Sequence, residues 1–121
     1  MAKYMLLLGG ADLDKRTGNP AVAPVIFQQF SAWVASLREG GHFVGTHKLN
    51  DHTGARLTVR GGQVVEGPFM ETKEAVGGAM IIEAASLEQA TALARNCPTL
   101  GLQKGFVEIR LIDEVPRPAS A

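Results

Sequence analysis

The run "YMLLL", residues 4–8, decides how this chain folds. It is short, apolar throughout and closed by Gly9 and Gly10, which favours a strand buried on both faces over a helix. We therefore predict that it is the first strand and that it lies in the centre of its sheet. A central strand of this kind needs a cover on both faces of the sheet.

A helix is predicted shortly after this strand. The polar segment 11–24 is expected to be a loop that enters the helix, with Asn19 as a cap and Pro20 in the first turn. Gly40 and Gly41 are expected to end the helix in a left-handed turn. Helical spacing places five apolar residues on one stripe: Ile26, Phe30, Trp33, Val34 and Leu37.

A second helix is predicted from a capping box at residues 86–89, where the Ser86 hydroxyl and the Gln89 side chain each satisfy a backbone donor. Pro98 is expected to stop this helix. Its apolar stripe would comprise Leu87, Ala90, Leu93, Ala94 and Cys97. On this stripe, Cys97 is a small core residue rather than a nucleophile.

Five further strands complete the pattern, two of them in a hairpin. Residues 42–49 form a strand that Gly45 is expected to bend or bulge, and residues 55–67 form a hairpin turned by Gly61 and Gly62. Residues 78–84 and 106–112 are the last two strands. This order predicts an α+β fold, ferredoxin-like βαββαβ with an inserted β-hairpin and with both helices on one face. Residues 1–113 would be one domain and residues 114–121 a C-terminal tail.

The second face of the sheet needs a cover, since the apolar run 4–8 cannot leave half of its side chains in water. Another subunit is the economical cover. We therefore expect a two-fold homodimer that packs sheet against sheet or closes a shared barrel.

Composition narrows the class of partner. The 121 residues carry 12 basic and 12 acidic side chains, so the formal net charge is zero. No summed field attracts nucleic acid or an anionic membrane surface, and neither is expected as a partner. A single cysteine excludes an intramolecular disulfide and suits a reducing compartment. No targeting segment is visible, and we expect a cytoplasmic protein.

The segment "LTVRGGQVVEGPFMETKEAVGG", residues 57–78, carries a family resemblance together with "KYMLLL" at 3–8 and "VEIRLI" at 107–112. These segments resemble the YCII-related family, in the branch named for an Asp-Gly-Pro-Phe (DGPF) signature. The resemblance implies a dimeric α/β-barrel fold related to ferredoxin-like domains, and it implies no known reaction. Some members are encoded beside or fused to alternative sigma factors.

Two departures from the family limit what can be carried over. Glu66 stands where the signature usually has Asp. Another branch is thought to be enzymatic through a His–Asp pair at its first helix, but residues 11–41 of this chain contain no histidine. Any activity must therefore use other groups.

The Gly-Pro-Phe loop supplies most of the candidate site residues. Pro68 and Phe69 would form apolar walls of a ligand pocket, and Glu71 would act as a general base if burial raised its pKa. Lys73 is a further ligand-binding candidate. The alternative is structural: Phe69 plugs the core or the dimer interface, and Glu71 pairs with Lys73.

Two candidates lie outside this loop. His47, inside the second strand, would transfer protons in a cavity on the sheet face. Arg60 shares a hairpin face with Arg56 and Thr58 and could hold a carboxylate, although such a row is more often solvated. His42 and His47 are five residues apart, so no metal site is expected unless Gly45 marks a bulge.

Two functions remain open. One is a small-molecule-binding or cofactor-independent enzyme domain acting on a small organic acid or aromatic metabolite, with no cofactor. The other is a noncatalytic regulatory or protein-interaction module, with a sigma factor as one partner that the resemblance implies.

Overall fold

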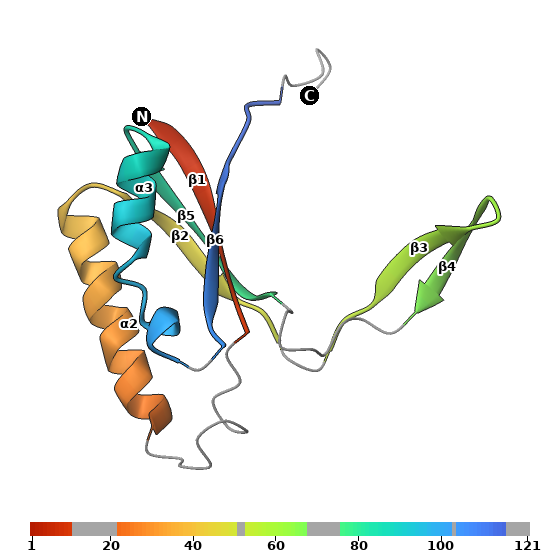
Figure 1. Cartoon of the computed structure of the whole chain (residues 1–121), viewed down its shortest axis with the longest axis horizontal. Helices are drawn as coiled ribbons and strands as arrows, with labels where there is room; N and C mark the ends of the chain where they lie inside the picture. The colour runs from red at the N-terminus through yellow and green to blue at the C-terminus, as the bar shows by residue number, and fades with distance from the viewer. Residues whose placement is uncertain (11–21, 51–52, 68–75, 103, 116–121) are drawn as a thin grey trace.

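A computed structural model describes residues 1–10, 22–50, 53–67, 76–102 and 104–115 of the chain (Figure 1). The elements in order are β1 (Ala2–Gly9), α2 (Val22–Glu39), β2 (Phe43–Lys48), β3 (Arg56–Arg60), β4 (Gln63–Gly67), β5 (Val76–Ala84), α3 (Leu87–Ala94), the 3₁₀ helix η1 (Pro98–Gly101) and β6 (Phe106–Leu111). The predicted Asn19 cap and the Pro20 turn lie outside the described residues.

The four-stranded sheet has the order β2-β5-β1-β6. All three pairings are antiparallel, and β1 lies between β5 and β6. The prediction of a central first strand is confirmed. This order is the split βαβ arrangement, so the α+β ferredoxin-like fold is also confirmed.

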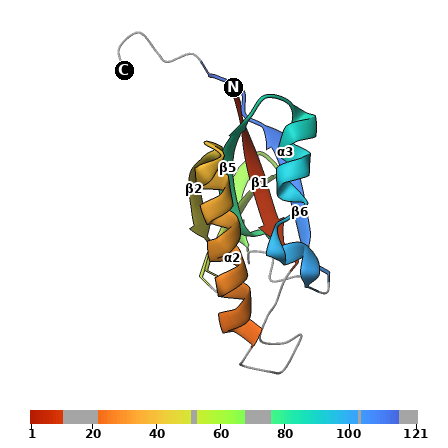
Figure 2. The same cartoon turned by 90° about the vertical axis from the view of Figure 1, so that its left-hand side faces the viewer.

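Both helices cover the same face of this sheet (Figures 1 and 2). The core lies between helices and sheet because alternate residues of the central strands point to that side. It contains Tyr4, Leu6 and Leu8 of β1, Met80, Ile82 and Ala84 of β5, Trp33 and Leu37 of α2, Ala90 and Ala94 of α3, and Cys97.

Helix α2 follows the predicted stripe. Trp33 and Leu37 are buried, and Phe30 and Val34 pack against the core. After the helix, Gly41 takes a φ of +76° and the His42 amide donates to the Leu37 carbonyl at 2.8 Å. The left-handed stop at the glycine pair is confirmed.

Helix α3 begins as predicted. The Gln89 amide donates to the Ser86 hydroxyl at 3.1 Å, and the Gln89 side chain accepts from the Ala85 amide at 2.6 Å. The predicted stripe is wrong at Leu87, which is 55% exposed. Helical side chains lean toward the N-terminus, so the side chain of a first-turn residue leans out past the helix end.

The predicted end of α3 is also wrong. The helix stops at Ala94, and Pro98 opens η1 instead of stopping α3. A residue before proline is pushed out of the helical region, and Cys97 has φ −63° and ψ 125°. Its amide still donates to the Ala94 carbonyl at 2.9 Å, and Cys97 is buried as predicted.

The hairpin and the bulge are confirmed. The register of β2 against β5 shifts between Phe43 and Gly45. Strands β3 and β4 form a separate two-stranded sheet, and both turn residues, Gly61 and Gly62, have positive φ. This hairpin projects from the sheet on the side opposite the helices (Figures 1 and 2).

Candidate functional site

The face of the sheet that the helices leave uncovered is the principal candidate surface, and we call it the open face. Residues directly opposite each other on antiparallel strands share a face. Met5 pairs with Ile81 and with Arg110, and Leu7 pairs with Ala79 and with Glu108. The open face therefore comprises Met5, Leu7, Ala79 and Ile81, with Lys3, His47, Glu83, Glu108 and Arg110 around them.

The centre of the open face is an apolar floor. Met5 and Leu7 come from β1, and Ala79 and Ile81 come from β5. Each of the four is half-buried, whereas their neighbours on the helix side are buried. The floor exists because both central strands are apolar on both faces, as the run "YMLLL" predicts.

Charged groups border this floor in both signs. The Arg110 guanidinium lies 3.3 Å from the Glu108 carboxylate, with both side chains largely exposed, so this pair contributes little to stability. Glu83 is opposite Lys3 at the other end of the face. The border therefore carries two acidic and two basic side chains.

His47 lies on the edge strand β2, opposite Ala79, and is exposed. The alternation along β2 places its imidazole on the open face beside the apolar floor. This geometry gives the floor a group that can hydrogen-bond to a ligand.

His42 has a different, structural position. Its Nδ1 lies 2.7 Å from the Glu83 carbonyl oxygen, and the Glu83 amide donates to the His42 carbonyl at 2.8 Å. The ring is therefore engaged in joining the end of α2 to β5. No group of three or more His, Cys, Asp or Glu in the described part of the chain could hold a metal ion.

Four predicted site residues, Pro68, Phe69, Glu71 and Lys73, lie outside the described residues. Among the other two, His47 lies on the sheet, whereas Arg60 ends β3 opposite Gln63 at the hairpin turn. Figure 1 shows that turn far from β2. Within one chain the structure does not bring Arg60 and His47 together.

The rim of the open face was only partly foreseen. The alternation in residues 106–112 indicates a polar face, and this face carries Glu108 and Arg110. The sequence does not single out Glu83, because this residue follows four apolar residues in a strand where buried and half-buried positions alternate. Only its register against Lys3 places it on the rim.

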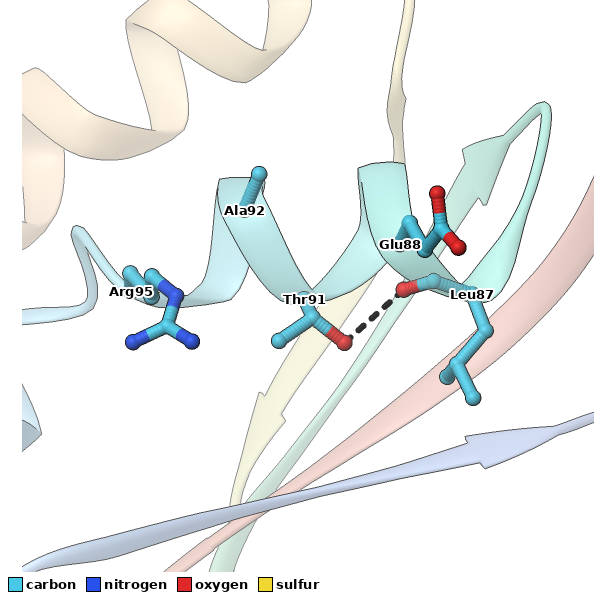
Figure 3. A pocket seen from close by; sticks show the side chains of 5 residues that line it. All are labelled: Leu87, Glu88, Thr91, Ala92 and Arg95. Carbon is cyan, nitrogen blue, oxygen red and sulfur yellow. Dashed lines mark hydrogen bonds between the residues drawn. The ribbon is translucent and has the colours of Figure 1, made fainter.

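A recess of about 340 Å³ lies on α3 (Figure 3). All of its lining residues, Leu87, Glu88, Thr91, Ala92 and Arg95, belong to one helix or its cap. The Thr91 hydroxyl donates to the Leu87 carbonyl at 2.8 Å, so it is not free to donate to a ligand. A single helix gives no facing wall, and we do not regard this recess as a site.

Burial disfavours a nucleophilic role for Cys97. Its thiol is buried, and burial raises its pKa above the ordinary value, which disfavours the reactive thiolate. Hydrogen bonds to Thr99 oppose this effect and are the smaller influence. The prediction that Cys97 is a core residue is confirmed.

Among the described segments, no helix is both long and apolar enough to cross a membrane.

Comparisons with known proteins give the family. Curated proteins gave no match to the chain. The model of the YCII-related domain matches residues 24–116, from the first turn of α2 to beyond β6. The assignment to the DGPF branch stays a prediction. Because the family model matches most of the length of the chain, the chain belongs to the YCII-related domain family.

Proposed function

We propose that this chain is a small-molecule-binding domain that works as a homodimer, with the open face at the dimer interface and His47 at the ligand site. The observation that carries the proposal is the open face itself. It is an apolar floor on a central pair of strands, with an exposed imidazole at its edge. A floor of this kind needs a cover, and a polar group at its border can orient a ligand.

A second copy of the chain suits the open face as its cover. Lys3, Glu83, Glu108 and Arg110 give the face no net formal charge, so two copies can meet without net repulsion. A two-fold interface requires such a self-complementary patch. Each Met, Leu or Ile that leaves water completely contributes up to about 1.5–3 kcal/mol.

The ligand we propose is a small organic acid or aromatic metabolite. Its apolar body would pack on Met5, Leu7 and Ile81, and His47 would hydrogen-bond its carboxylate or hydroxyl. In this proposal Pro68 and Phe69 add apolar walls, and Glu71 and His47 are the acid–base pair of a cofactor-independent proton transfer. Lys73 and Arg60 are proposed to hold the ligand's carboxylate. Because Arg60 lies far from His47 of the same chain, it would hold only a ligand that is bound to another copy.

The test is a thermal-shift screen of the purified protein against small aromatic and carboxylic acids. A ligand at about a hundred times its dissociation constant adds about 2.7 kcal/mol, which is on the order of ten degrees for a domain of this size. The screen is repeated with His47→Gln and Glu71→Gln. The matched control is Lys48→Gln, an exposed neighbour of His47 that alternation places on the other face of β2.

We expect a hit whose shift is lost in His47→Gln and retained in Lys48→Gln. A hit that responds equally in both variants would remove His47 from the site. If no acid shifts the melting temperature of the wild-type protein, the small-molecule proposal fails.

The second candidate is a noncatalytic interaction module, with a sigma factor as the partner that the family resemblance suggests. The observation that favours it is the β3–β4 hairpin, which presents exposed apolar side chains away from the sheet. Titration of the purified sigma factor into the labelled protein tests this candidate. Saturable binding without any small-molecule hit would favour it over the first.

A further inference from the structure

The β3–β4 hairpin, residues 56–67, has an apolar face and a polar face, and we call this hairpin the arm. The register pairs Leu57 with Glu66 and Val59 with Val64 on one face. Leu57, Val59 and Val64 are 65%, 69% and 69% exposed. The other face carries Arg56, Thr58 and Arg60, opposite Gly67, Val65 and Gln63. The arm therefore presents a strip of three aliphatic side chains to solvent.

Nothing in the described part of the same chain covers this strip. Strands β3 and β4 pair only with each other, and neither packs extensively against another described element. A two-stranded hairpin alone in water is at best marginally stable, because one ladder and one apolar strip do not offset the entropy of ordering it. The arm needs a surface to pack against.

The position of the arm indicates which surface that is. In Figures 1 and 2 the helices lie on one side of the sheet and the arm extends on the other side, which is the side of the open face. A second copy that covers the open face would occupy the space beside the arm. The arm of that second copy would lie beside the first molecule by the same symmetry.

We propose that the arm clasps a second copy of this chain, with the apolar face of Leu57, Val59 and Val64 packed against the partner molecule. This inference rests on the proposed homodimer. It adds a reciprocal contact, in which the arm of each molecule packs against the other molecule. A second copy is favoured over an unrelated protein because one two-fold operation can cover both apolar surfaces that the described residues leave uncovered, the open face and the arm. The exchange also carries Arg60, on the polar face of the arm, toward the other molecule.

The first test is the dimer dissociation constant of the full chain, measured by sedimentation velocity over a dilution series. Val59→Ser with Val64→Ser removes most of the apolar face, and Arg56→Gln with Thr58→Ala changes the opposite face of the same arm as the matched control. We expect the first pair to raise the dissociation constant by roughly tenfold or more and the control to change it by less than about threefold. Far-ultraviolet circular dichroism checks that each variant retains the fold.

The second test measures burial of the arm directly. Val59→Cys and Thr58→Cys place one reporter thiol on each face, and the buried Cys97 reacts too slowly to interfere. We expect maleimide labelling of Val59→Cys to slow by roughly fivefold or more when the protein is concentrated from monomer to dimer, with a smaller change for Thr58→Cys.

The outcomes separate this inference from the homodimer on which it rests. A wild-type dimer whose dissociation constant is the same in the Val59 and Val64 variant, with equal labelling of the two faces, would overturn the arm contact and leave the homodimer standing. A wild-type protein that stays monomeric at high micromolar concentration would overturn both.

Discussion

The thiol of Cys97 gives a pH-dependent contribution to stability. Because burial raises its pKa in the folded state, the unfolded chain loses the thiol proton first as the pH rises. In that range the folded state binds more protons than the unfolded state, so the free energy of unfolding falls by up to about 1.4 kcal/mol per pH unit. This contribution is fully present below the ordinary thiol pKa and is lost above it.

We therefore expect the wild-type protein to lose more stability than Cys97→Ala between about pH 8 and pH 10. Urea unfolding at several pH values, followed by circular dichroism, measures the difference. The free energy of unfolding of the variant is lower at neutral pH, because the buried thiol-bearing side chain is replaced by a smaller methyl group. Parallel curves for the two proteins over this range would contradict the prediction.

Trp33 joins α2 to the end of α3 through one hydrogen bond. Its Nε1–H donates to the Leu93 carbonyl at 3.2 Å, and its ring packs edge-on against Phe30 with centroids 6.0 Å apart. Trp33→Phe leaves that carbonyl without its donor and opens space in the core. We expect a loss of about 1–3 kcal/mol in denaturant unfolding. Phe27→Leu, at an exposed position of the same helix, is the control and should change stability by less than about 0.5 kcal/mol.

At the scale of elements, η1 and the start of β6 meet so closely that one position must be glycine. A Cβ on Gly105 would collide with the backbone carbonyl oxygen of Thr99, which cannot swing away as a side chain can. We expect Gly105→Ala to cost about 1–3 kcal/mol by thermal or chemical unfolding.

Gly45→Ala is the matched control, because a Cβ at that position of β2 meets no atom within 4 Å. It should alter stability by roughly 0.5 kcal/mol or less. Equal losses in the two variants would mean that glycine is required for backbone freedom in general and not for the contact with Thr99.

Most elements could be predicted from the sequence because their signals are local. The capping box at Ser86, the Gly61–Gly62 turn and the stripe that includes Trp33 each act within one or two turns of chain. The errors at Leu87 and at the end of α3 arose where periodicity was extended past a boundary. At Leu87 the side chain points toward the N-terminus of the helix and past its first turn, so it stays exposed. At the other end, the residue before Pro98 cannot adopt helical backbone angles easily.

The candidate site could be predicted less well, because it depends on pairing between distant strands. His47 was identified from the chain, but its neighbours on the open face follow from the registers of β5 against β1 and β2. Those registers join residues about thirty or more positions apart, as the pairings of His47 with Ala79 and of Met5 with Ile81 show. A pattern along one segment carries no information on which residue lies opposite.

At the scale of the whole molecule, the described residues leave two apolar surfaces uncovered on the same side of the sheet. The open face centres on Met5, Leu7 and Ile81, and the arm carries Leu57, Val59 and Val64. The helices occupy the other side, so among the described residues one side of the sheet is covered and the other is not (Figure 2). A single proposed two-fold contact would account for both surfaces.

A dimer held by these surfaces makes thermal stability depend on protein concentration. If folded dimers unfold to separate chains, a tenfold rise in concentration adds about 1.4 kcal/mol per dimer. For two chains of 121 residues the unfolding entropy is roughly 0.5 kcal/mol/K. The melting temperature should then rise by about 2–3 °C per tenfold increase, measured by scanning calorimetry. Leu7→Glu, which puts a carboxylate on the apolar floor, should abolish this dependence, whereas Lys48→Gln should keep it. A wild-type melting temperature independent of concentration would show that folding of this chain is not coupled to association.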